Sequence, residues 1–151
     1  MASAQQVDDK RRHVISFILG RELYGFDLHM VNKVIEVPDF FFVPRAPSFT
    51  RGVISHRGKV IAVVDLSEFL GMGTARTGPD HRILVIASSE YHLGFLVDRV
   101  ERIEYVPVRG PLVQPSSGEN PYVSKIVNLG GRIFNLIDLE KLLAEIEEYF
   151  A

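Results

Sequence analysis

The sequence contains no cysteine, and this absence removes several kinds of chemistry at once. Disulfides, zinc–thiolate sites, iron–sulfur clusters and thiol nucleophiles all require cysteine sulfur. The absence does not by itself identify a cellular compartment. With 151 residues, of which 46% are hydrophobic, the chain is long enough to bury roughly two-thirds of its unfolded surface in an ordinary globular core.

Long apolar runs are also missing. No run approaches the roughly 20 residues of a membrane span, and the first 14 residues lack the apolar core of a secretory signal. Residues 1–12 are rich in charge, so we expect a frayed tail there. The net charge of −2 provides no overall field that would attract nucleic acid or an anionic bilayer. We therefore expect a cytoplasmic protein without direct membrane insertion and without a nucleic-acid partner.

Recognised catalytic signatures are absent as well. The patterns HExxH, GxSxG, GxGxxG and GxxxxGK[ST] do not occur. The five histidines are scattered, and no close pair of acid and histidine, Asp27 and His29 included, belongs to a recognised catalytic motif. Two histidines and a carboxylate could still converge on a metal in three dimensions, although no spacing favours it. We expect no enzymatic activity, no cofactor and no metal site.

What the sequence does contain is an internal repeat. Residues 51–70, RGVISHRGKVIAVVDLSEFL, return 73 positions later as SKIVNLGGRIFNLIDLEKLL in residues 124–143. A second similarity, at an offset of 69 positions, relates residues 25–34 to residues 94–103 and begins in both copies with Gly-Phe. Two copies of a unit of about 70 residues predict two similar sub-structures, and make the region where they meet a natural place for function.

Short runs of β-branched and aromatic residues, each bounded by turn-forming residues, predict a mostly β protein built of hairpins. The clearest helix should begin after Asp138, which is a good N-cap, and present an apolar face towards the core. The matching Asp65 should cap a shorter helical turn that Gly71 ends. Because both aspartates occupy the same position of the repeat, we interpret them as helix caps and not as a catalytic pair.

These residues also match a known family. The segments LGRELYGFDLHMVNKVIEV, VPRAPSFTRGVISHRGKVIAVVDL, LGFLVDRV and NLIDLEKLL resemble CheW, the coupling protein of bacterial chemotaxis, from residue 13 to about residue 143. The resemblance implies two intertwined five-stranded barrels of the Src-homology type with a C-terminal helix. It further implies one CheW-like domain over residues 1–151, with sub-barrels at about 13–70 and 81–151. Residues 71–80, with three glycines, a proline and no apolar periodicity, would form the connector between them.

Members of this family are scaffolds without an active site, so the resemblance implies two protein partners. One is the regulatory domain of a CheA-type histidine kinase, and the other is the cytoplasmic hairpin tip of a chemoreceptor. The receptor-binding positions of the family correspond here to Val34, Glu36, Gly52 and Arg57. The kinase-facing surface of the second barrel corresponds to Val97, Asp98 and Arg99, although the apolar run around Val97 favours a core position and leaves Asp98 and Arg99 as the exposed candidates.

Charge supports the receptor-facing assignment only in part. Residues 43–64 contain Arg45, Arg51, Arg57 and Lys59 and no acidic residue, which fits either a solvated strand face or a basic edge for an acidic partner. Arg57 precedes a glycine in a tight turn, so it can present its guanidinium to a carboxylate. Glu36 would either form a surface salt bridge of little consequence or lie across a groove from Arg57 and fix the register of the partner.

The chain departs from the family pattern at two places. It has Ser55-His56-Arg57-Gly58 where Asn-Leu-Arg-Gly is usual, and it carries three successive phenylalanines, Phe40, Phe41 and Phe42. Since side chains alternate along an extended segment, at least one of these rings should be exposed. The rings would pack locally or anchor a partner. The alternative function is a small β-barrel that binds single-stranded nucleic acid through these rings and the nearby arginines.

Overall fold

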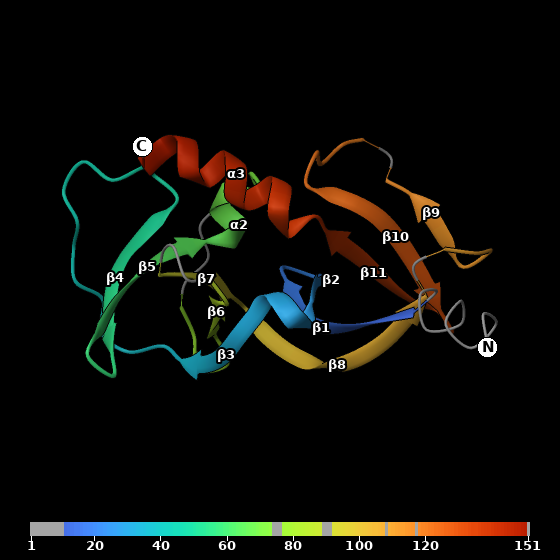
Figure 1. Cartoon of the computed structure of the whole chain (residues 1–151), viewed down its shortest axis with the longest axis horizontal. Coiled ribbons are helices and arrows are strands. Elements are labelled where there is room, and N and C mark those ends of the chain that lie inside the picture. Colours follow the sequence, from blue (N-terminus) through green and yellow to red (C-terminus); the bar gives the residue numbers. More distant parts are fainter. Residues whose placement is uncertain (1–10, 74–76, 89–91, 108, 117, 151) are drawn as a thin grey trace. The chain divides into compact units, whose positions relative to one another are not determined.

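The computed structural model describes residues 11–73, 77–88, 92–107, 109–116 and 118–150, and the chain divides into two compact units (Figure 1). Unit 1 comprises residues 1–17, 21–28 and 101–151, and unit 2 comprises residues 18–20 and 29–100. Each unit is built around one β-sheet. The two repeats therefore do not coincide with the two units, since each unit includes residues from both halves of the sequence.

Unit 1 contains a six-stranded sheet in the order β8-β1-β2-β11-β10-β9. Its strands are β1 (Arg11–Leu19), β2 (Glu22–Asp27), β8 (Arg99–Pro107), β9 (Val113–Pro115), β10 (Val123–Leu129) and β11 (Arg132–Ile137). In Figure 1, β9 lies along β10 at the edge of this sheet. A core cluster of Val14, Val106, Val127 and Phe134 is buried in this unit.

The C-terminal helix α3 (Leu139–Phe150) follows β11 directly. Leu139, Leu142, Leu143 and Ile146 are all buried, and their spacing of three and four residues places them on one face of the helix. The carboxylate of Asp138 accepts a hydrogen bond from the Lys141 backbone N–H at 3.1 Å. The predicted capped, amphipathic C-terminal helix is therefore confirmed.

Unit 2 contains a five-stranded sheet in the order β3-β6-β7-β5-β4. Its strands are β3 (Val31–Glu36), β4 (Thr50–His56), β5 (Lys59–Asp65), β6 (Arg82–Ile86) and β7 (Leu93–Val97), and the 3-10 helix η1 (Leu28–Met30) leads into β3. The interior is a buried cluster of Ile54, Ile61, Val63, Ile83, Val85 and Leu96. Every residue of β7 is buried, as expected for the central strand of a curved sheet covered on both faces.

A short helix, α2 (Leu66–Phe69), ends the first repeat. Asp65 is its N-cap, and the carboxylate accepts a hydrogen bond from the Glu68 backbone N–H at 3.3 Å. At the other end, Gly71 has φ 80°, and the N–H groups of Gly71 and Met72 donate to the carbonyls of Glu68 and Ser67. This is the Schellman arrangement that glycine favours, so both the predicted cap and the predicted stop are confirmed.

The two sheets are built alike. Under the repeat, β8, β1, β2, β11 and β10 correspond to β3, β6, β7, β5 and β4, and the order of strands is the same in both sheets. The parallel pairs also share a register: Leu136 lies opposite Gly25 in unit 1, and Val63 lies opposite Gly94 in unit 2. Residues 53–65 and 126–137 therefore adopt the same strand–turn–strand structure, as the repeat predicts.

This arrangement explains why the barrels are intertwined. Strand β2 belongs to the first repeat and pairs with β11 of the second, while β5 of the first repeat pairs with β7 of the second. The sub-barrels expected at about 13–70 and 81–151 follow the sequence repeats. Each compact unit instead combines strands from both repeats. Unit 1 also has one strand more than the expected five, the three-residue strand β9.

Glycine occupies the repeated Gly-Phe position because the sheet leaves no room for a side chain there. A Cβ on Gly94 would lie 2.6 Å from Cγ2 of Ile83, which is closer than such atoms approach in folded proteins. The following residue is a fully buried phenylalanine in both copies, Phe26 and Phe95. The repeat therefore encodes a small residue at a close contact followed by a large residue in the core.

We predict that Phe95→Ala lowers the free energy of unfolding by roughly 3 to 5 kcal/mol, the usual result of emptying a packed aromatic site. Phe95 has no exposed surface, so removal of its ring leaves a cavity inside the core. Phe42→Ala is the matched control, because Phe42 is 86% exposed and its loss should change stability by about 0.5 kcal/mol or less. Chemical denaturation measures both values, and similar midpoints for the two variants would contradict the prediction.

Candidate partner-binding surface

All seven residues that the resemblance assigns to partner contacts lie in described parts of the chain. Exposure along β3 alternates, with Asn32, Val34 and Glu36 pointing outward and Ile35 packing on the core of unit 2. Val34 is 40% exposed, although an aliphatic side chain gains by burial. Val34 and Glu36 are therefore available for contact from one face of one strand.

Arg57 lies at the tip of the β4–β5 hairpin and is exposed. With Arg57 at φ 50° and Gly58 at φ 79°, the two-residue loop has the positive φ values of a type I′ turn, which matches the twist of the flanking strands. The same turn in unit 1 consists of Gly130 and Gly131, at φ 57° and 88°. Arg57 thus has a left-handed backbone conformation, and the residue at the equivalent position of the other repeat is a glycine. A residue other than glycine in this conformation is strained.

Gly52 has a structural role. It is buried, has φ 138°, and a Cβ at this position would lie 2.6 Å from the carbonyl oxygen of Phe41. The close approach is needed because Phe41 and Val53 exchange two backbone hydrogen bonds of 2.8 and 2.9 Å. The expected direct contact of Gly52 with a receptor is therefore revised: Gly52 allows the segment before β4 to pair with that strand.

Glu36 and Arg57 do not lie across one groove. Glu36 lines a cavity of about 490 Å³ together with Phe40, Arg51 and Arg82, and Arg57 lines a separate cavity of about 210 Å³ together with Lys33 and Lys59. The reason lies in β3, because Lys33 and Glu36 are three residues apart and thus about 10 Å apart along the strand. The start of β3 lines the cavity at the β4–β5 turn, and its end lines the cavity at the start of β4.

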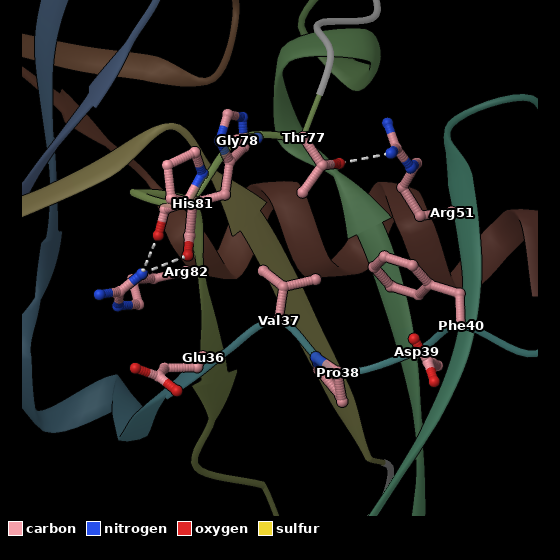
Figure 2. A pocket seen from close by; sticks show the side chains of 11 residues that line it. Glu36, Val37, Pro38, Asp39, Phe40, Arg51, Thr77, Gly78, His81 and Arg82 are labelled. Carbon is pink, nitrogen blue, oxygen red and sulfur yellow. Dashed lines mark hydrogen bonds between the residues drawn. The ribbon is translucent and has the colours of Figure 1, made fainter.

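Figure 2 shows the larger cavity, with Arg82 on one side, Arg51 on the other and Val37 between them. Arg51 donates to the Thr77 hydroxyl at 2.5 Å, forms an ion pair with Asp65 at 3.4 Å and lies over the Phe40 ring at 5.8 Å. Burial raises the pKa of the Asp65 carboxyl, against the opposing effects of the Glu68 N–H and of Arg51. Arg51 is therefore held by contacts within unit 2.

The three phenylalanines before β4 differ in their exposure. Phe40 is partly buried and packs against the core of unit 2. Phe41 is 61% exposed and Phe42 is 86% exposed. The prediction that at least one ring is exposed is confirmed.

The residues assigned to the kinase-facing surface have three different environments. Val97 is fully buried at the end of β7, and its expected contact with a partner is revised to a role in the core. Asp98 is engaged on both oxygens: one accepts from the Gly20 N–H at 2.8 Å and the other lies 3.4 Å from Nε2 of His81. Arg99 is exposed at the start of β8 and keeps the expected position at the surface.

His81 completes this linkage. Its Nδ1 accepts a hydrogen bond from the Gly78 N–H at 2.9 Å, so the ring hydrogen is on Nε2, which faces Asp98. Asp98 and His81 thus tie the β1–β2 turn to the segment that precedes β6. Sequence reasoning missed this linkage because its members lie in three segments without a shared motif.

Exposed apolar residues at equivalent repeat positions were missed as well, except for Val34. Val34 corresponds to Ile103 and Val60 corresponds to Ile133, and these side chains are 40%, 56%, 63% and 51% exposed, respectively. Both pairs lie at aligned positions of the two offset repeats, so the alignment of the repeats carried the signal. Each unit therefore presents the same two apolar positions to its surroundings.

Within the described part of the chain, no helix is long and apolar enough to cross a membrane. No group of three or more histidine, aspartate or glutamate side chains there could hold a metal ion.

We predict that Asp98→Ala lowers the free energy of unfolding by roughly 1 to 3 kcal/mol, because the Gly20 N–H and His81 both lose a charged partner. Asp39→Ala is a suitable control, since Asp39 is an exposed carboxylate in the same unit. Thermal or chemical denaturation distinguishes the two variants. If Asp98→Ala is as stable as the wild-type protein, Asp98 is free to serve only as a contact residue.

Comparison with known proteins extends these observations. The family model for the CheW-like domain matches residues 13–147. The protein FrzA of Myxococcus xanthus is 37% identical over 131 residues, covering 84% of this chain and 82% of its own. A chemotaxis protein CheW of Thermotoga maritima is 30% identical over 145 residues, covering 91% of each chain.

A solved structure agrees with the sequence comparisons. The crystal structure of the scaffolding protein TtCheW from Thermoanaerobacter tengcongensis superposes with a TM-score of 0.72 at 28% sequence identity, covering 85% of this chain and 84% of that one. The nucleic-acid-binding alternative is not favoured by any of these relatives. The match of the family model to both repeats and both units shows that the chain belongs to the CheW-like domain family.

Proposed function

We propose that this chain is a non-catalytic adaptor that couples chemoreceptors to a CheA-type histidine kinase in chemotaxis signalling. The observation that carries the proposal is the family match over residues 13–147, which includes every strand of unit 2 and all the residues assigned to partner contacts. Relatives named as chemotaxis and scaffolding proteins support the same role. A partner at the cytoplasmic tip of a receptor implies a cytoplasmic location.

On the receptor side, the contact residues in this proposal are Val34, Glu36 and Arg57. Val34 offers an exposed aliphatic side chain, and Arg57 offers a guanidinium at a fixed turn. Because Glu36 and Arg57 line separate cavities, a single receptor helix would contact them at different points along its length. Opposite charges at these points would fix its register and disfavour unsuitable helices.

On the kinase side, Arg99 is the contact residue, and Asp98 and Val97 position the strand end that carries it. The mechanism is positional and requires no bond to be made or broken. An adaptor that holds a kinase regulatory domain beside a receptor tip lets a small receptor movement change the population of kinase conformations. This coupling requires that the contacts differ between the two signalling states.

The receptor assignment predicts that Arg57→Glu weakens binding of a receptor-tip fragment by about 2 kcal/mol or more, close to thirtyfold in Kd, because an acidic receptor side chain would then face a like charge. Arg57→Gly should weaken binding less while keeping the turn, since glycine is the repeat counterpart. Isothermal titration calorimetry with each purified variant measures these differences.

Arg21→Glu is the matched control, because Arg21 is also an exposed arginine in a two-residue hairpin turn. Its affinity for the receptor fragment should equal that of the wild-type protein. Equal affinities for the wild type and folded Arg57→Glu would remove Arg57 from the interface.

The kinase assignment predicts a separate effect for Arg99. Arg99→Glu should weaken binding to the regulatory domain of the kinase by at least about 1 kcal/mol, while leaving affinity for the receptor fragment unchanged. Surface plasmon resonance with both partners immobilised on separate channels compares the two affinities on one sample. A loss on the receptor channel alone would assign Arg99 to the other surface.

A further inference from the structure

The smaller cavity of unit 2 has an unusual distribution of charge. It is lined by Lys33, His56, Arg57, Lys59 and His92, with Ile61 among the apolar residues of its wall. None of the described residues that line it is acidic. We call this site, defined by those five basic residues, the basic cavity. Lys33 is half-buried and Arg57 and Lys59 are exposed, so the three permanent cations around about 210 Å³ repel one another across a partly solvated space.

The local backbone directs these side chains into one place. The pairing of β3 with β6 shifts register between Val31 and Lys33, and such a bulge re-aims the side chains beside it. On the opposite side, the type I′ turn holds Arg57 at φ 50°. The register shift in β3 and the left-handed conformation of Arg57 therefore lie at the same cavity. Strained backbone of the kind seen at Arg57 is often found at binding sites.

His56 supplies an independent observation. Its Nε2 atom is buried and has no hydrogen-bond partner among the described residues. A buried polar atom without a partner lowers stability, and native proteins rarely leave one unexplained. His56 lines the basic cavity, and rotation of its ring into the cavity would let a bound hydrogen-bond acceptor satisfy this atom.

We propose that the basic cavity binds a small dianionic oxyanion of the phosphate class. Such an ion would offset the repulsion among Lys33, Arg57 and Lys59, and its oxygens would accept hydrogen bonds from these side chains and from His56. The cavity volume of about 210 Å³ accommodates a phosphate group with a few water molecules and is too small for a whole nucleotide. Binding is a property of the chain alone, and it does not depend on the proposed receptor contact.

The test is a titration of the full chain, labelled with ¹⁵N, with inorganic phosphate while sodium chloride keeps the ionic strength constant. Saturable shifts should appear at the amides of residues 32–33, 56–59 and 92, and a titration with acetate should give clearly weaker binding. His56→Leu and Lys59→Gln should each weaken phosphate binding by about tenfold, the loss of one charge-assisted hydrogen bond. The amide spectrum of each variant reports whether it is folded.

His29→Leu is the matched control, because His29 is an exposed histidine of the same unit that does not line the basic cavity. It should bind phosphate as the wild type does. The proposal is overturned if the shifts do not saturate, if they centre on other residues, or if both His56→Leu and Lys59→Gln retain full affinity. Equal affinities for acetate and phosphate would overturn the assignment to a dianion.

Discussion

A parallel strand pair joins the two sequence repeats within each unit, and the rest of the architecture depends on these two pairings. In unit 2, β5 lies beside β7 with Val63 opposite Gly94, and in unit 1, β11 lies beside β2 with Leu136 opposite Gly25. Each pairing has a glycine at its centre, because a Cβ there would collide with a side chain of the antiparallel neighbour on the other side, Val14 of β1 or Ile83 of β6. The exchange of strands, the shared strand order and the position of both hairpin turns follow from this arrangement.

The repeat made much of the fold predictable. Asp65 and Asp138 occupy one repeat position, and both accept a hydrogen bond from a backbone N–H of the helix that follows. The exchange of strands was less accessible from the residues themselves, because similar segments can pair within a repeat or between repeats. Periodicity identifies a strand and its exposed face, but it does not identify the neighbouring strand. The family resemblance supplied that information.

In the candidate site, the positions of residues were predicted correctly where the local backbone determines them. Arg57 was placed correctly at an exposed turn because an arginine followed by glycine between two apolar runs has few alternatives. The apolar run around Val97 favoured a core position, which its complete burial agrees with, whereas the family resemblance had assigned it to the kinase-facing surface. Glu36 was expected either to form a surface salt bridge or to oppose Arg57 across a groove, and the rise along β3 places these two residues in separate cavities.

The pairing of β2 with β11 has a consequence for how the protein is made. Leu136 and Gly25 are neighbours in the sheet, yet a ribosome synthesises them more than one hundred codons apart. Unit 1 cannot close until almost the whole chain has emerged, and until then one edge of β2 lacks its native neighbour. Contacts between residues so distant in sequence form slowly and leave unpaired edges exposed to aggregation. Unit 2 ends at residue 100, so it can close while the last third of the chain is still being translated.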